Sequence, residues 1–147
     1  MQISTTRWLV TLILLSVSTV AHTDEAAEAA FVAAAGYTVK LTVTSEFGFI
    51  ESEPGSWRGA GFLVDRQRGW ILTNAHVAGY VPALIEAQFR GAKNIAAKAL
   101  FVDNLQDIAV LEIPSAAIPA EVGEAPLACD GLPGVGADFG TFGHPLA

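Results

Sequence analysis

His76 and Asp107 are the two side chains whose types and settings best suit acid–base chemistry. His76 follows a short apolar stretch that closes in Thr73-Asn74-Ala75, so its ring is expected where a strand ends. At that position one ring nitrogen can face a cleft while the other is bonded inward, which is the geometry of a general base. Asp107 leads directly into the apolar segment Ile108-Ala109-Val110-Leu111. A carboxylate at the edge of a core can hydrogen-bond an imidazole and fix its tautomer.

Each of these residues also has an ordinary structural interpretation. His76 could be a loop histidine that bonds the backbone, and Asp107 could be a turn residue that accepts hydrogen bonds from nearby backbone N–H groups. Asp103 or Asn104 could fill that turn role equally well, which leaves Asp107 available for another role. The presence of both His76 and Asp107 favours the chemical interpretation.

The segments that must position these residues have the pattern of short β-strands. Val39, Leu41 and Val43 alternate with polar residues over positions 38–44, which is typical of a half-buried strand. Further strand candidates are residues 61–65, 70–74, 83–89, 96–102 and 108–113, the first two joined as a hairpin by the polar turn 66–69. Such closely spaced strands, with no helical period between them, predict an all-β fold, either an antiparallel barrel or a sandwich.

The N-terminal residues predict export. Residues 1–21 have the layout of a signal peptide, with Arg7, an apolar run over 8–20 and small residues up to Ala21. The competing interpretation is a membrane anchor, but the run is shorter than the roughly 20 residues that a span needs. We therefore expect a periplasmic or extracellular protein with no stable membrane span after cleavage. Residues 22–36 are alanine-rich, carry acids near their start and close in Gly36, which predicts a short helix.

The regions around and after the strands are expected to be irregular. Residues 45–57 contain glycine, proline and glutamates and predict a surface loop. Residues 114–137 are rich in proline and glycine and predict a linker, which separates a unit at 37–113 from residues 138–147. Residues 138–142 could begin one more strand, which would have no later partner in this sequence, so we expect an interrupted protein.

Composition excludes several classes of function. The chain has 147 residues with 8 Lys and Arg against 15 Asp and Glu, and this acidic balance disfavours a nucleic-acid partner. A single cysteine, Cys129, permits no internal disulfide, and no cluster of Cys and His is present to hold a metal. Gly134, Gly136 and Gly140 lack the spacing of a dinucleotide-binding loop, so no cofactor is expected.

Four motifs together resemble one known family. They are GAGFLVD (residues 59–65), GWILTNAHV (69–77), DIAVL (107–111) and FGHP (142–145). In this order they resemble the trypsin-like serine proteases of the HtrA/Deg type over residues 59–147. The resemblance implies that His76 is the catalytic histidine and Asp107 the catalytic aspartate. It also implies a fold of two six-stranded antiparallel barrels, with residues 37–113 as the first barrel and 138–147 as the start of a truncated second one.

The sequence departs from the family pattern in three places. Ala60 replaces the usual Ser or Thr of Gly-Ser/Thr-Gly, and His144 replaces the usual Asn of Gly-Asn-Pro. The nucleophile motif Gly-Asn-Ser-Gly-Gly is absent. The serines beyond residue 21 are Ser45, Ser52, Ser56 and Ser115, none of which has that setting.

Two functions are therefore expected from different classes. The first is a serine endopeptidase that acts by acyl transfer on polypeptides, above all unfolded or misfolded proteins, with no nucleophile serine in this chain and hence no activity of its own. The alternative is a non-catalytic exported β-barrel module, a pseudoprotease or remnant, that binds peptides or partner proteins. An oligomer is compatible with both.

Overall fold

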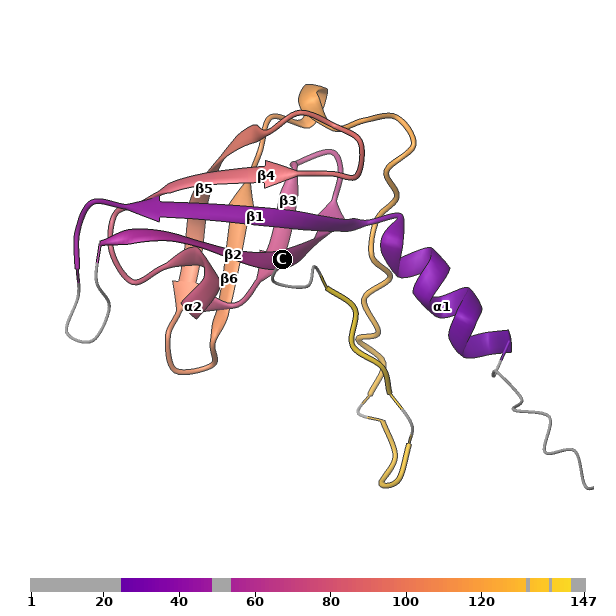
Figure 1. Ribbon diagram of the computed structural model, residues 1–147. Helices are drawn as coiled ribbons and strands as arrows, with labels where there is room; N and C mark the ends of the chain where they lie inside the picture. Colours follow the sequence, from indigo (N-terminus) through magenta and orange to yellow (C-terminus); the bar gives the residue numbers. More distant parts are fainter. Residues whose placement is uncertain (1–24, 49–53, 132, 138, 144–147) are drawn as a thin grey trace, which may run out of the picture.

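The computed structural model describes residues 25–48, 54–131, 133–137 and 139–143 (Figure 1). The predicted signal peptide at residues 1–21 lies outside these ranges, as does His144. Within them, no helix has both the length and the apolar character needed to cross a membrane.

Six antiparallel strands close into a barrel in the order β1-β2-β3-β6-β5-β4. Their bounds are β1 Thr38–Ser45, β2 Gly55–Asp65, β3 Trp70–Thr73, β4 Leu84–Gln88, β5 Ile95–Asp103 and β6 Ile108–Glu112. The pairing of β1 with both β2 and β4 closes the barrel. This confirms the all-β class and the six-stranded antiparallel barrel, and it removes the sandwich that the strand pattern alone left open.

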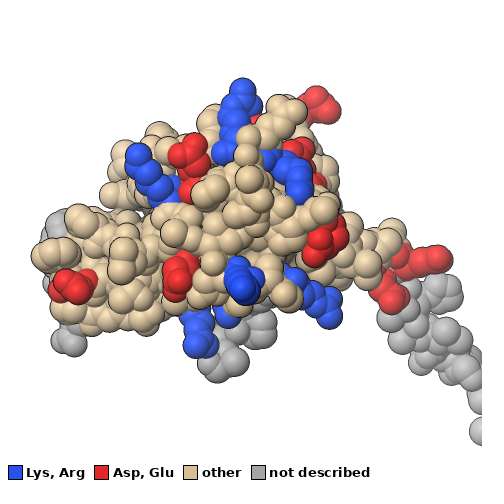
Figure 2. Space-filling model, turned by 90° about the horizontal axis from the view of Figure 1, so that it is seen from above, with Lys and Arg blue, Asp and Glu red and all other residues tan. Residues whose placement is uncertain are grey.

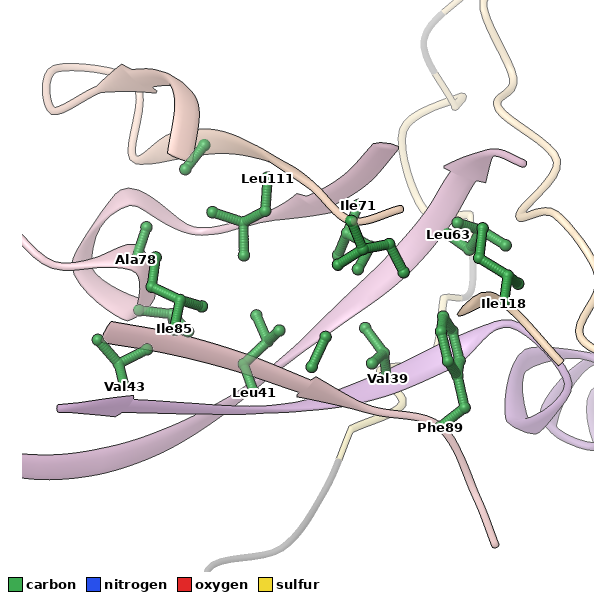
Figure 3. Close-up of a cluster of buried hydrophobic side chains, with 14 residues drawn as sticks. Val39, Leu41, Val43, Leu63, Ile71, Ala78, Ile85, Phe89, Leu111 and Ile118 are labelled. Carbon is green, nitrogen blue, oxygen red and sulfur yellow. The ribbon is translucent and has the colours of Figure 1, made fainter. Parts of the chain in front are cut away.

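The core of the barrel comes from the alternation seen in the sequence. Val39, Leu41 and Val43 of β1 point inward and are fully buried, as are Leu63, Ile71 and Leu111 of the strands around them. In Figure 3, Val43, Ile85 and Ala78 lie toward one end of the cluster, and Phe89 and Ile118 lie toward the other. Ile118 comes from the region predicted as linker, so part of that region belongs to the core.

Strand β2 begins earlier than predicted. Residues 55–57 were expected in a surface loop, but they continue the β1 ladder, with Gly55 opposite Ser45 and Trp57 opposite Val43. The loop prediction rested on proline, glycine and charge, which describe local propensity. A long strand on the other side of the ladder overrides that propensity, because it offers hydrogen-bond partners to the backbone groups that face it.

Two α-helices lie near opposite ends of the barrel (Figure 1). Helix α1, Glu25–Ala35, forms within the range expected for it. The amide of Gly36 donates to the Ala33 carbonyl at 2.9 Å and the Thr38 hydroxyl donates to the Ala34 carbonyl at 2.7 Å, so the first residue of β1 satisfies part of the helix end. Helix α2, Ala75–Ala78, is a single turn that the sequence pattern did not predict.

The region after β6 is fastened to the barrel by Arg66, which lies in the turn between β2 and β3. Its guanidinium donates to the carbonyl oxygens of Val122 at 2.6 Å, Pro119 at 2.8 Å and Ile118 at 3.1 Å. Its backbone amide donates to a carboxylate oxygen of Glu124 at 2.6 Å. Residues 118–125, which we name the strap, therefore follow the barrel surface instead of linking freely.

Residues 139–142, the described part of the segment expected to begin a strand, form no strand. Residues 139–143 have no regular secondary structure, and position 138 lies outside the described ranges. Phe142 instead lies near Phe31 of α1, with the ring centroids 6.2 Å apart. A strand needs a neighbour for its backbone groups, and no described strand pairs with this segment. Its assignment to a second barrel stays a prediction.

Charged side chains of both signs are interspersed on the face of the molecule seen in Figure 2. One local pair is Asp65 with Arg68, whose carboxylate and guanidinium lie 2.5 Å apart. The guanidinium of Arg68 also lies over the Trp70 ring, 5.0 Å from its centroid. This mixture produces no large field of one sign on that face.

We predict that Arg66→Ala releases the strap while the barrel stays folded. Hydrogen bonds to a charged group contribute about 1.5–3 kcal/mol, so amide exchange at Gly123 and Ala125 should accelerate about tenfold or more. These amides donate to Gly36 at 3.1 Å and to Leu63 at 2.7 Å. Hydrogen exchange followed by NMR measures the change.

Arg66→Lys should behave like Arg66→Ala, because a lysine ammonium cannot reproduce a planar fork directed at several carbonyls. Lys98→Ala, at an exposed lysine of β5 away from the strap, is the matched control and should leave both amides unchanged. Equal acceleration in the Lys98 variant would contradict a specific role for Arg66.

Candidate active site

The pairing of β3 with β6 brings the two predicted site residues together. The strands are antiparallel, with Ile71 opposite Leu111 and Thr73 opposite Ala109. The end of β3 therefore lies beside the start of β6, which is where His76 and Asp107 are attached. Residues far apart in the chain become neighbours because two apolar strands share one ladder.

Helix α2 holds His76 at this edge of the barrel. Its backbone closes on Asn74, whose carbonyl accepts hydrogen bonds from the amides of Val77 and Ala78, each at 3.1 Å. Val77 and Ala78 are buried in the core. His76 lies on the opposite side of this turn, so its side chain points outward to solvent. The indole N–H of Trp57 donates to the Val77 carbonyl at 2.9 Å and fixes the end of the turn from β2.

A glycine of β2 leaves the room that this turn needs. A Cβ placed on Gly59 would lie 2.7 Å from Cγ2 of Val77 and closer still to Cγ1, which is shorter than real contacts allow. A side chain at Gly59 would therefore push Val77 and the turn that carries His76 away from the barrel. Gly59 begins the GAGFLVD motif, and this packing is a physical reason for a glycine there.

The imidazole of His76 and the carboxylate of Asp107 are in direct contact. Nδ1 of His76 lies 2.8 Å from Oδ2 and 3.0 Å from Oδ1 of Asp107, which is the contact expected from the sequence. An ionised carboxylate only accepts hydrogen bonds, so the proton of a neutral ring lies on Nδ1 and Nε2 is left as an acceptor. The side chains are 58% and 43% exposed, so the pair is open to solvent.

Two further donors fix the carboxylate from the β3–α2 junction. The backbone amide of His76 donates to Oδ1 of Asp107 at 3.0 Å. The side-chain amide of Asn74 donates to Oδ2 and to the backbone carbonyl of Asp107, each at 3.1 Å. Asp107 itself has φ 53°, in the left-handed region, which aspartate tolerates better than most residues. The carboxylate is thus oriented by several contacts besides the ring.

These contacts lower the pKa of Asp107 below its ordinary value. The backbone amide of His76 is the largest cause, and partial desolvation opposes it. The hydrogen bond and charge of the His76 ring and the amide of Asn74 act in the same direction as the backbone amide. Asp107 is therefore an anion over the whole range in which a histidine titrates.

The structure distinguishes the roles that the sequence left open for Asp103 and Asp107. Asp103 performs the turn role, since its carboxylate accepts from the amides of Leu105 at 2.9 Å and Gln106 at 3.1 Å. Asp107 instead faces His76. Asn74 was named only as the end of a strand. Its place two residues before His76 is the one signal in the sequence, and its two contacts with Asp107 were not predicted.

None of the described serines is bonded to the His76 ring. The Ser45 hydroxyl lies near the carbonyls of Pro82 at 3.0 Å and Phe47 at 3.1 Å, and that of Ser56 accepts from Thr44 at 3.0 Å. Ser115 begins a short 3₁₀ helix after β6, and Ser52 lies outside the described ranges. In the described part of the chain, no three His, Cys, Asp or Glu side chains are grouped as a metal site.

Comparison with known protein families places most of the barrel in one group. Residues 59–147, more than half of the chain, match the model of a family described as the trypsin-like peptidase domain. The match includes His76, Asp107 and the strands that carry them. No curated protein matches the chain significantly.

We predict that Gly59→Ala destabilises the fold and displaces His76, because the new methyl group overlaps Val77. Overpacking of this kind costs about 1–3 kcal/mol, which urea unfolding should detect. NMR of the His76 ring should show the contact with Asp107 disturbed.

Gly55→Ala in the same strand is the matched control, since a Cβ there meets nothing within 4 Å. Trimming Val77 to Ala should make Gly59→Ala less costly, because the overlapping Cγ atoms are gone. A Gly59 variant as stable as the Gly55 control would contradict the packing argument.

We predict that His76→Ala raises the pKa of Asp107 only part of the way back to its value in the unfolded chain. The backbone amide at position 76, the largest cause of the lowered pKa, survives every substitution except proline. Carboxyl ¹³C NMR titration measures the pKa of Asp107 in the folded chain and in the urea-unfolded chain.

The same shift makes stability depend on pH. Because the pKa of Asp107 is lowered by folding, its ionised form stabilises the folded chain. This stabilisation is fully present above the pKa of the unfolded chain, about 3.9, and is lost as the pH falls through the pKa of the folded chain. If the pKa of Asp107 in folded His76→Ala equals the pKa in the unfolded chain, the ring and not the backbone amide is the cause of the lowered pKa.

Proposed function

The chain belongs to the trypsin-like peptidase domain family, and from this premise we propose that it carries the histidine and aspartate of a serine-type endopeptidase. The observation that supports the proposal most directly is the 2.8 Å contact between Nδ1 of His76 and Oδ2 of Asp107. It leaves Nε2 able to accept a proton from a nucleophile. Peptidase family membership makes polypeptides the substrate class.

In the proposed reaction, His76 acts first as base and then as acid. Nε2 accepts the proton of a serine hydroxyl as its oxygen attacks the scissile carbonyl, and His76 later donates that proton to the leaving amine. Asp107 stays ionised throughout, holds Nδ1–H and stabilises the imidazolium. Its lowered pKa supports this role, because an aspartate that took up the proton could not stabilise the cation.

The nucleophile is proposed to come from residues outside this sequence. The motif Gly-Asn-Ser-Gly-Gly is absent from the 147 residues. The donors that stabilise the oxyanion are proposed to accompany that serine. On its own the chain would then be inactive.

The finer assignment is an exported protease of the HtrA/Deg type. It is supported by the ILTNAHV and DIAVL motifs and by the signal-peptide pattern of residues 1–21. Unfolded or misfolded proteins in the periplasm or outside the cell are the proposed substrates. The competing function is a non-catalytic binding module, favoured by the lack of a serine bonded to His76 among the described residues.

We predict that the 147-residue chain neither cleaves casein above background nor reacts with a fluorophosphonate, because no activated serine is present. A product of the same gene that carries a Gly-x-Ser-Gly-Gly segment should do both. In that product, His76→Ala should lower kcat by about 10⁴-fold or more, since the triad acts as a unit.

The outcomes separate the two functions. Casein bound without cleavage by the serine-bearing product would favour the binding module. Hydrolysis by the 147-residue chain that persists after fluorophosphonate treatment would contradict the serine mechanism altogether.

A further inference from the structure

Asn74 occupies a helix N-cap without using its side chain as a cap. The residue has extended backbone angles, φ −83° and ψ 149°, immediately before α2, and its side chain makes no capping hydrogen bond. Asparagine at this position ordinarily accepts a hydrogen bond from an amide of the first helical turn, which stabilises a helix by about 1 kcal/mol. Here the side chain is directed to another partner, so capping does not account for it.

That partner is Asp107, which the Asn74 amide contacts at two atoms. Nδ2 donates to the backbone carbonyl oxygen and to Oδ2 of Asp107, each at 3.1 Å. A primary amide carries two N–H bonds, one for each acceptor. The contact therefore holds a backbone atom and a carboxylate atom of the same residue and restricts rotation of the side chain between them.

A restraint on the Asp107 side chain matters because nearly half of that side chain is exposed to solvent. Its side chain is 43% exposed, and its backbone is in the left-handed region at φ 53°. The other donors to its carboxylate, the backbone amide and the ring of His76, both belong to one residue. The remaining acidic side chain of the turn, Asp103, bonds the amides of Leu105 and Gln106.

We propose that Asn74 is a positioning residue, which orients the Asp107 carboxylate toward Nδ1 of His76 and keeps the ring in the Nδ1–H tautomer. Its effect on catalysis rests on the proposed peptidase function. The effect on the His–Asp pair does not, and can be measured in the chain as it is. Both hydrogen bonds of the Asn74 amide go to Asp107 and neither goes to the His76 ring, so Asn74 acts through Asp107.

The wild-type chain provides the first test. In a pH titration followed by ¹⁵N and ¹³C NMR, the Asn74 side-chain amide resonances should shift with the same midpoint as the Asp107 carboxyl. Amide resonances that ignore this midpoint would overturn the proposal without any substitution.

Two variants provide the second test. Asn74→Ala removes the donors, and Asn74→Asp keeps the size but places a second carboxylate beside the first. Both should raise the pKa of Asp107 relative to wild type, the aspartate more strongly, and both should speed the exchange of the Nδ1 proton of His76. Asn104→Ala, at an exposed asparagine of the Asp107 turn, is the matched control and should change neither. A folded Asn74→Asp protein with an unchanged Asp107 pKa would overturn the proposal.

A kinetic test distinguishes this proposal from the peptidase function. In a serine-bearing product, Asn74→Ala should lower kcat by about 10- to 100-fold with little change in KM, because the base is misplaced while the substrate is still bound. Unchanged kcat in an active enzyme would overturn the positioning role alone. If every version is inactive while the NMR changes appear, the peptidase proposal fails and the positioning of Asp107 stands.

Discussion

The ladder between β3 and β6 is the constraint on which the candidate site depends. Thr73 opposes Ala109, so the residues just beyond β3 and just before β6 must meet at one edge of the barrel. Ile71 and Leu111, which pair within the ladder, are fully buried, so a shift of register by one residue would expose them to water. The burial of apolar side chains therefore fixes the separation of two polar ones.

The orientation of the carboxylate is a property of the backbone as much as of the histidine. The amide of His76 donates to Asp107 at 3.0 Å, and it is the largest cause of the lowered pKa of that carboxyl. This amide is directed by helix α2, which is held by the buried Val77 and the Trp57 indole. The packing of buried residues on the inner side of the turn thus determines the direction of the amide that binds the carboxylate on its outer side.

The sequence predicted those parts of the structure that follow from periodicity and from local chemistry. Alternation of apolar residues was sufficient to predict β1, and the setting of His76 and Asp107 was sufficient to predict that they interact. The prediction failed where secondary structure depends on a partner that is distant in the chain. Residues 55–57 pair with β1, and residues 139–142 have no partner strand among those described. Asn74 was missed because its role depends on the left-handed turn at Asp107, which no sequence pattern announces.

An exposed His–Asp pair is geometrically complete but electrostatically weak. At 58% and 43% exposure, water screens the attraction between an imidazolium and a carboxylate, and exposed pairs of this kind contribute little energy. The same contact gains strength when water is excluded, since Coulomb energy rises as the local dielectric constant falls. In the proposed peptidase, the part that supplies the serine would also cover this edge of the barrel. The barrel therefore contributes the geometry of the pair, and in the proposed peptidase the covering part would strengthen its electrostatic interaction.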